Sequence, residues 1–120
     1  LHTWQAPTLY GHGTPTRDYV YVEDVVRALL AASGRRGTFN VATGVETDVM
    51  TVWNALRAAA CVVVEPELAA LRPGELQHSC LDVTRAEREL GWRAEVPIAE
   101  GLGRTYAALV EEFERAESAR

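Results

Sequence analysis

The stretch "YGHGTPTRDYVYVEDVVRA", residues 10–28, contains a glycine loop, an Arg-Asp pair and then an apolar run. Gly11–Gly13 begins the G-x-G-x-x-G pattern of a dinucleotide-binding loop, but Thr16 replaces the last glycine of that pattern. The pattern must also follow a strand and open a helix, whereas residues 18–22 are mostly β-branched or aromatic and predict a strand. The loop is therefore not expected to cradle a dinucleotide, and Arg17 becomes the better candidate for a ligand-binding group.

The size and composition of the chain limit the classes of protein to which it can belong. Its 120 residues suffice for one domain with one core. A hydrophobic content of 48% and a charged content of 24% are typical of soluble globular proteins. The net charge of −5 argues against nucleic acid as a partner. No apolar run approaches the roughly 20 residues that span a bilayer, and no signal-peptide pattern opens the chain. We therefore expect a cytoplasmic protein without a membrane partner.

The cysteine, histidine and lysine content argues against a disulfide, a metal site and lysine-dependent catalysis in this chain. Cys61 and Cys80 stand beside apolar residues without a C-x-x-C or Cys/His cluster, so reduced core thiols are expected and a disulfide has no support in the pattern. The three histidines show no metal-ligand spacing, so no metal site is expected. All twelve basic side chains are arginine. Chemistry that depends on a lysine ammonium cannot come from this chain.

Hydrophobic periodicity and capping residues predict an α/β pattern. Helices are expected at 25–33, 48–60 and 83–90, capped by Asp24, Thr47 and Asp82, and from Pro97 onward. Strands are expected at 8–10, 18–22, 38–43 and 61–66, and residues 67–80 are expected to be mostly loop. Gly91 should end the third helix, with Trp92 packing back onto it. Such short strands are too few for a complete doubly wound sheet.

Three helices carry apolar stripes that a core would use. The stripes are Val25, Val26, Leu29 and Leu30 in the first helix, Val49, Val52, Trp53 and Leu56 in the second, and Ile98, Leu102, Tyr106, Leu109 and Phe113 in the last. We expect the last stripe in particular to be core.

Four blocks in order carry a resemblance to a known family. They are "PTLYGHGTPTRDYVYVEDVVRA" (7–28), "GTFNVATGVETDV" (37–49), "RPGELQHSCLDVTRAERELGW" (72–92) and "VPIAEGLGRTYAAL" (96–109). Together they resemble the C-terminal substrate domain of NAD-dependent nucleotide-sugar epimerases and dehydratases, the extended short-chain dehydrogenase/reductase family, and within it the UDP-glucose 4-epimerase type. The implied fold is a small mixed α/β substrate-binding subdomain, residues 1–120, without the N-terminal Rossmann domain.

The resemblance implies roles for six residues: Arg17 and Arg72 for the diphosphate, Glu75 for the ribose hydroxyls, and Leu9, Tyr19 and Val49 near the base. The chemistry agrees, because guanidinium groups bind phosphate with bidentate, charge-assisted hydrogen bonds and a carboxylate accepts from a vicinal diol. Plainer roles stay open. Arg17 could form a surface salt bridge with Asp18, the Arg72–Glu75 segment could be a turn with a charged rim, and the three apolar or aromatic residues could be core.

The resemblance also implies NAD on a Rossmann domain and a catalytic Tyr-x-x-x-Lys pair. A chain without lysine cannot contain that pair, and it carries no complete glycine fingerprint. We therefore expect a nucleotide-sugar (UDP- or dTDP-sugar) binding fragment that does not catalyse alone, with a separate N-terminal Rossmann half as a further partner. A stand-alone binding module and a non-functional remnant are the alternatives. The base, the sugar and the choice between 4-epimerase and 4,6-dehydratase stay open.

Overall fold

The computed structural model describes residues 5–120. The elements in chain order are β1 (Thr8–Tyr10), the short 3-10 helix η1 (Gly11–Gly13), β2 (Thr16–Arg17), α1 (Val22–Ala32), β3 (Thr47–Asp48), α2 (Val49–Ala60), β4 (Glu67–Ala69), α3 (Thr84–Leu90) and α4 (Ile98–Ser118). The small mixed α/β character expected from the sequence is confirmed.

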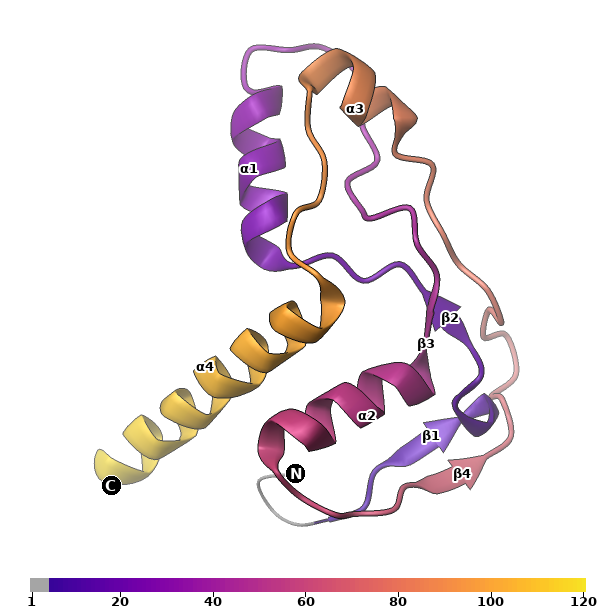
Figure 1. Ribbon diagram of the computed structural model, residues 1–120, viewed down its shortest axis with the longest axis vertical. Helices are drawn as coiled ribbons and strands as arrows, with labels where there is room; N and C mark the ends of the chain where they lie inside the picture. Colours follow the sequence, from indigo (N-terminus) through magenta and orange to yellow (C-terminus); the bar gives the residue numbers. More distant parts are fainter. Residues whose placement is uncertain (1–4) are drawn as a thin grey trace.

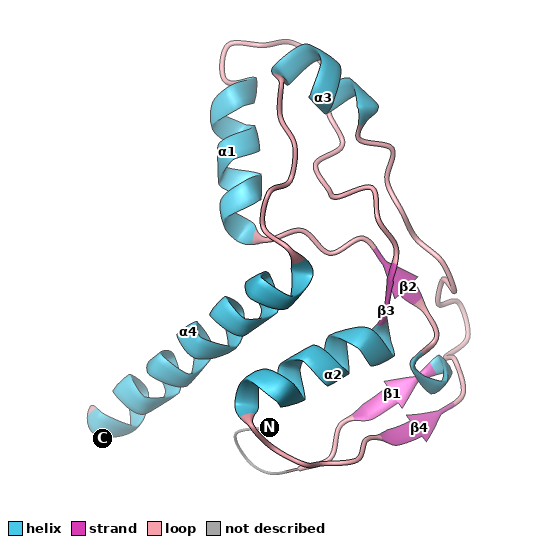
Figure 2. Ribbon diagram, in the orientation of Figure 1, coloured by secondary structure: helices cyan, strands magenta, loops and turns pink. Residues whose placement is uncertain are grey.

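The elements gather at two ends of a flat molecule (Figure 1). One end holds α2, α4 and the β1–β4 pair, the other holds α1 and α3, and β2 with β3 lies between them. Figure 2 shows that loops form most of the connections between the two ends. The extents are 46 × 39 × 22 Å and the radius of gyration is 16.9 Å, against about 14 Å for a compact chain of this length. The fold is open, and its two ends share little core.

The strands form two separate pairs. β1 and β4 are parallel, with Leu9 opposite Leu68, and β2 and β3 are antiparallel, with Arg17 opposite Thr47. The strand predicted at 8–10 is confirmed, and the segment expected to be loop contains β4.

The strands predicted at 18–22, 38–43 and 61–66 are wrong, since these segments are not strands in the structure. Their composition favours β-structure, but a strand also needs a neighbour that supplies ladder hydrogen bonds. Val63, expected in a buried strand, is 93% exposed.

The turn after β1 depends on its glycines. Gly11 has a φ of +63°, and a Cβ at this position would lie 2.6 Å from Cγ of Pro15. Only glycine fits a left-handed backbone with that close approach. The turn brings the chain around from β1 to β2 within five residues, so that Arg17 lies at the start of the second strand pair.

Asp24 joins α1 to the segment that enters α4. The helix begins at Val22 after Tyr21, so the predicted N-cap role of Asp24 is wrong. Its carboxylate is 1% exposed and accepts from Arg27 Nη2 at 2.7 Å and from the main-chain N–H groups of Glu95 at 3.2 Å and Val96 at 3.1 Å. Burial works to raise the pKa of Asp24, but these hydrogen bonds outweigh it and lower the pKa below its usual range.

Trp92 confirms the packing predicted for it. Its ring is 2% exposed and belongs to the core cluster with Ala28 of α1 and Ala86 of α3. The indole Nε1 donates to the main-chain oxygen of Asp24 at 2.9 Å. Gly91 ends α3 in the left-handed conformation, as predicted. This cluster connects α1 with α3.

Two predicted helix caps lie one residue away from the actual ones. α3 has Val83 at its N-cap, although the Asp82 carboxylate still accepts from the Thr84 N–H at 2.9 Å. α2 is capped by Asp48 rather than Thr47, and the Asp48 carboxylate accepts from the Thr51 N–H at 2.6 Å. An aspartate caps the helix as the predicted threonine would, because both side chains place an oxygen acceptor near the free N–H groups of the first turn.

The apolar stripes are only partly covered. The α4 stripe faces α2, but Leu109 and Phe113 stay exposed, so the expectation of a core stripe is wrong for its C-terminal half. On α1 the exposed apolar side chains are Val22, Val26, Leu29 and Leu30. The accessible surface of 8208 Å² exceeds the about 6,400 Å² typical of a monomer of this mass. Such apolar faces usually mark an interaction surface.

Both cysteines are exposed, so the prediction of core thiols is wrong. Cys61 ends α2 in the left-handed conformation and Cys80 lies in the loop before α3. The segment that begins at Cys61 does not form the buried strand expected at 61–66. Among residues 5–120, no helix is long and apolar enough to cross a membrane.

Candidate functional site

The segments that carry the predicted binding residues lie side by side, although about 60 positions separate them in the sequence. The Thr16 N–H donates to the main-chain oxygen of Gln77 at 2.8 Å, and Gln77 Nε2 donates to Thr14 Oγ1 at 2.9 Å. Further along, the Leu81 N–H reaches the Asp18 carboxylate at 3.4 Å. These hydrogen bonds fix β2, which ends at Arg17, next to the loop that follows β4.

Residues 72–75 form a β-turn. The Glu75 N–H donates to the Arg72 main-chain oxygen at 3.2 Å, and Gly74 has a φ of +83°. Proline followed by glycine with positive φ is the type II arrangement. The turn with a charged rim, expected from the sequence as the plainer role of this segment, is present, and it places the side chains of Arg72 and Glu75 on the same side.

The Arg72 guanidinium is paired with Glu75 in a fork. Nε donates to Oε2 at 3.1 Å and Nη2 donates to Oε1 at 2.8 Å, while the Arg72 main-chain N–H also reaches Oε2 at 3.2 Å. The guanidinium carbon lies 4.3 Å from the centre of the Tyr10 ring, at the end of β1. This stacking holds the guanidinium plane at a fixed orientation.

Arg17 lies close enough to Glu75 for their charges to interact. The hydrogen bond from Arg72 is the main cause that lowers the pKa of Glu75, partial burial opposes it, and the positive charge of Arg17 lowers it further. Arg17 Nη1 donates to the Thr16 main-chain oxygen at 2.6 Å. The hydrogen bonds of Thr16 and Thr14 with Gln77 place the segment of Arg17 beside the one that follows the 72–75 turn, and we call Arg17, Arg72 and Glu75 together the arginine clamp.

Asp18 anchors this region instead of pairing with Arg17. Its carboxylate accepts hydrogen bonds from the N–H groups of Thr43 and Gly44, both at 2.8 Å. Burial acts to raise the pKa of Asp18, but the hydrogen bonds outweigh it and lower the pKa below its usual range. Among residues 5–120, Asp18 and Arg17 form no ion pair, so the plainer expectation of a surface salt bridge is wrong. Within the described part of the chain, the Arg17 guanidinium has one acceptor, the Thr16 main-chain oxygen.

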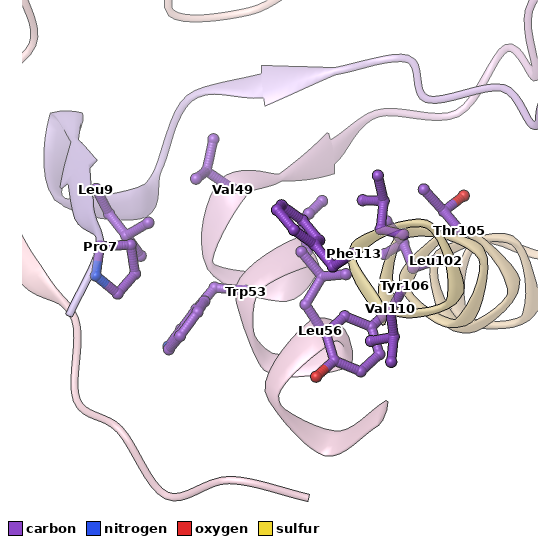
Figure 3. Close-up of a pocket in the computed structure, with 12 residues that line it drawn as sticks. Pro7, Leu9, Val49, Trp53, Leu56, Leu102, Thr105, Tyr106, Val110 and Phe113 are labelled. Carbon is purple, nitrogen blue, oxygen red and sulfur yellow. The ribbon is translucent and has the colours of Figure 1, made fainter. Parts of the chain in front are cut away.

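The three remaining candidates lie away from the arginine clamp. Leu9 and Val49 line an apolar pocket of about 610 Å³ between β1, α2 and α4, together with Trp53 (Figure 3). In Figure 3 the side chains of α4, such as Phe113, point toward α2 across this pocket. Tyr19 lines a second pocket, of about 380 Å³, beside α3 and the start of α4. The structure thus places Leu9 and Val49 in one pocket and Tyr19 in another, and neither pocket is lined by a residue of the arginine clamp.

Tyr10 is a residue of the site that the sequence did not single out. Leu9 and Tyr10 alternate along β1, so that Leu9 is buried and Tyr10 is exposed. The alternation was visible in the sequence. The partner of Tyr10 was not, because Arg72 approaches it only through the pairing of β1 with β4.

Comparisons with known proteins agree on one family. A sequence profile for the family described as GDP-mannose 4,6 dehydratase matches residues 2–105. A UDP-glucose 4-epimerase of Mycolicibacterium smegmatis is 45% identical over 100 residues, which cover 81% of this chain and 32% of that protein. The chain therefore spans about a third of the length of this curated relative.

Solved structures of UDP-glucose 4-epimerases also resemble this chain. The UDP-glucose 4-epimerase of Thermotoga maritima, solved with UDP-glucose, is 35% identical with a TM-score of 0.85, covering 92% of this chain and 37% of that one. The UDP-glucose 4-epimerase of Thermus thermophilus, solved with NAD, is also 35% identical, with a TM-score of 0.76, covering 88% and 35%.

Proposed function

The chain belongs to the GDP-mannose 4,6 dehydratase family, and from this premise we propose that it is the nucleotide-sugar-binding domain of an NAD-dependent epimerase of the UDP-glucose 4-epimerase type, without catalytic activity of its own. The observation that carries the proposal is the arginine clamp, in which the Arg72–Glu75 pair and Arg17 lie on neighbouring, hydrogen-bonded segments. The relative from Thermotoga maritima, solved with UDP-glucose, supports the ligand class.

The proposed ligand lies with its diphosphate on the arginines and its ribose on the carboxylate. A diphosphate carries at least two negative charges, and two guanidinium groups hold them with charge-assisted hydrogen bonds of about 1.5–3 kcal/mol each. Glu75 accepts from the ribose hydroxyls. We propose either Tyr19 or Val49 as the neighbour of the base, since the two line separate pockets, and Leu9 only through its main chain, because its side chain is buried.

The Gly11–Gly13 turn does not fit the phosphate-binding loop of an NAD site. Gly11–Gly13 forms a 3-10 turn with His12 at a φ of 57°, and a two-residue strand follows it instead of a helix whose N-terminus would face a phosphate. We therefore assign no step of hydride transfer to these residues. The proposal places NAD on residues outside this chain.

The exposed face of α1 supports a partner polypeptide. Val22, Val26, Leu29 and Leu30 are 49–73% exposed on one helix, and such a face is normally covered. The adjacent segment 38–43 has strand composition but no strand pairing within the described chain. We propose that the separate Rossmann half covers this face. A stand-alone module would leave it in water.

Calorimetry with UDP and UDP-glucose tests the proposal. We expect binding to the wild-type protein, and a dissociation constant about 10–100-fold higher for Arg72→Ala. Arg115→Ala is the matched control, since it removes the same charge at an exposed position in the last turn of α4, and it should bind as the wild type does. Equal affinity in both variants would refute the clamp. A protein that gives no heat and lacks a cooperative unfolding transition would instead be a non-functional remnant.

A further inference from the structure

The carboxylate of Asp18 holds three separate segments of the chain together. Its Oδ1 accepts hydrogen bonds from the main-chain N–H of Thr43 at 2.8 Å and from the Thr43 hydroxyl at 2.5 Å. Its Oδ2 accepts from the N–H groups of Gly44 at 2.8 Å and Leu81 at 3.4 Å. Asp18 follows β2, Thr43 and Gly44 lie before β3, and Leu81 lies in the loop before α3. Three segments far apart in the sequence therefore meet at one side chain.

Arg17 lies between two attachments to the loop that follows β4. The residue before it, Thr16, donates its N–H to the main-chain oxygen of Gln77 at 2.8 Å. The residue after it, Asp18, bonds to the same loop four positions further on. Gln77 stands two positions after the end of the 72–75 turn. The main chain of Arg17 is thus tied on both sides to the segment that leaves this turn.

We propose that Asp18 is a positioning residue that sets the distance between Arg17 and Arg72, and that this distance selects ligands with two linked phosphates. The inference rests on the proposed function, in which the two arginines hold one diphosphate. Asp18 itself touches no ligand, because its two oxygens are occupied by donors from residues 43, 44 and 81. It acts on binding through the main chain of Arg17.

The ionised carboxylate is needed for this role. Both of its oxygens only accept hydrogen bonds, so each can hold a different set of donors. The pKa of Asp18 lies below its usual range, so the group is ionised at neutral pH. An asparagine at this position has one acceptor oxygen and one NH₂ donor. Whichever way the amide turns, either Thr43 or the pair of Gly44 and Leu81 faces a donor instead of an acceptor.

The number of phosphates in a ligand reports on the distance between the two arginines. A diphosphate contacts both arginines only while they stand at the right separation, because charge-assisted hydrogen bonds need donor and acceptor within about 2.7–2.9 Å. A monophosphate contacts one arginine and does not depend on where the other stands. A change in this distance therefore weakens UDP and leaves UMP nearly unchanged, whereas partial unfolding weakens both ligands by the same factor.

The test is calorimetry at neutral pH, with UDP titrated directly and UMP measured by displacement of UDP. For Asp18→Asn we expect UDP to bind about tenfold weaker than to the wild type, and the affinity for UMP to change by less than about twofold. Asp82→Asn is the control, because it makes the same chemical change in the loop before α3. The Asp82 carboxylate accepts from the Thr84 N–H, and asparagine keeps an acceptor oxygen, so this variant should match the wild type with both ligands.

The outcomes separate this inference from the proposed function. If the wild type binds UDP and Asp18→Asn binds it equally well, the positioning inference is overturned and the proposed function stands. A loss of the same factor for UDP and UMP has the same meaning. If the wild type does not bind UDP, both are overturned.

A second pair of variants keeps the inference testable if Asp18→Asn does not fold. Thr43→Val removes the hydroxyl that donates to Asp18 Oδ1, and Thr43→Ser keeps it. We expect Thr43→Val to bind UDP about threefold weaker with UMP unchanged, and Thr43→Ser to restore the affinity of the wild type. Equal affinity of these two variants for UDP would overturn the inference.

Discussion

Replacement of Asp24 by asparagine tests how the two ends of the molecule are joined. The buried carboxylate accepts hydrogen bonds from two main-chain N–H groups in the segment before α4 and from the guanidinium of Arg27. Asparagine keeps one acceptor oxygen and turns an NH₂ donor toward the other donors, so at least one main-chain N–H loses its acceptor. An unsatisfied buried donor costs about 1–3 kcal/mol and a hydrogen bond to a charged group contributes about 1.5–3 kcal/mol. We expect Asp24→Asn to lower the free energy of unfolding by about 3 kcal/mol.

Acid should remove the difference in the free energy of unfolding between Asp24→Asn and the wild type. The pKa of Asp24 in the folded protein lies below its unfolded value, which is about 3.9. The stabilisation from the carboxylate is therefore complete above about pH 5 and is lost as the pH falls through about 4 toward the folded pKa. Urea unfolding of wild type and Asp24→Asn at several pH values measures the difference, which should be largest near neutrality and shrink in acid.

The control for this experiment is Asp48→Asn. Asp48 caps α2 with its side chain, and asparagine caps helices as well as aspartate does. We expect a change below about 0.5 kcal/mol. A loss below about 1 kcal/mol for Asp24→Asn, or a loss that stays constant from neutral to acid pH, would refute the assignment of Asp24 as the link between α1 and α4.

Four further substitutions test the fold. Gly11→Ala should lower the free energy of unfolding by more than about 1 kcal/mol, because Gly11 has a positive φ and lies close to a proline ring. Gly103→Ala, in open space within α4, is the control and should raise it by about 0.5–1 kcal/mol. Equal effects of the two substitutions in urea unfolding would refute the argument that the turn after β1 requires glycine. Trp92→Phe should cost about 1–3 kcal/mol, since the buried main-chain oxygen of Asp24 loses its donor, and an unchanged thermal midpoint would contradict this. Leu30→Glu should change the unfolding free energy by less than about 0.5 kcal/mol, because Leu30 is 73% exposed; a loss of several kcal/mol would mean that this face of α1 is covered within the chain.

The helices were largely predictable from the sequence, because their hydrogen bonds close within each segment. α2 and α3 begin within one residue of the predicted position. α1 begins three residues earlier than predicted, at Val22. The difference has a tertiary cause: the Asp24 side chain, which locally reads as a cap, bonds to residues 95 and 96 instead.

The strands were much less predictable, because a strand is defined by a partner that sequence alone does not identify. Segments 38–43 and 61–66 have strand composition and find no partner within the described residues. Residues 67–69 have less β character, yet they form β4 because β1 lies beside them. β-propensity therefore located apolar extended segments but did not say which of them pair.

The sequence by itself determined the helices, apart from the start of α1, and indicated the turn at Arg72–Glu75, since these depend on residues within a few positions of one another. Only the tertiary structure decided that Arg17 lies near Glu75, that Tyr10 stacks on Arg72, and that Leu9 and Val49 face an apolar pocket instead. These contacts join residues about 40–60 positions apart. They depend on the pairing of β1 with β4 and on the hydrogen bonds of Thr16 with Gln77 and Asp18 with Leu81, which no local pattern encodes.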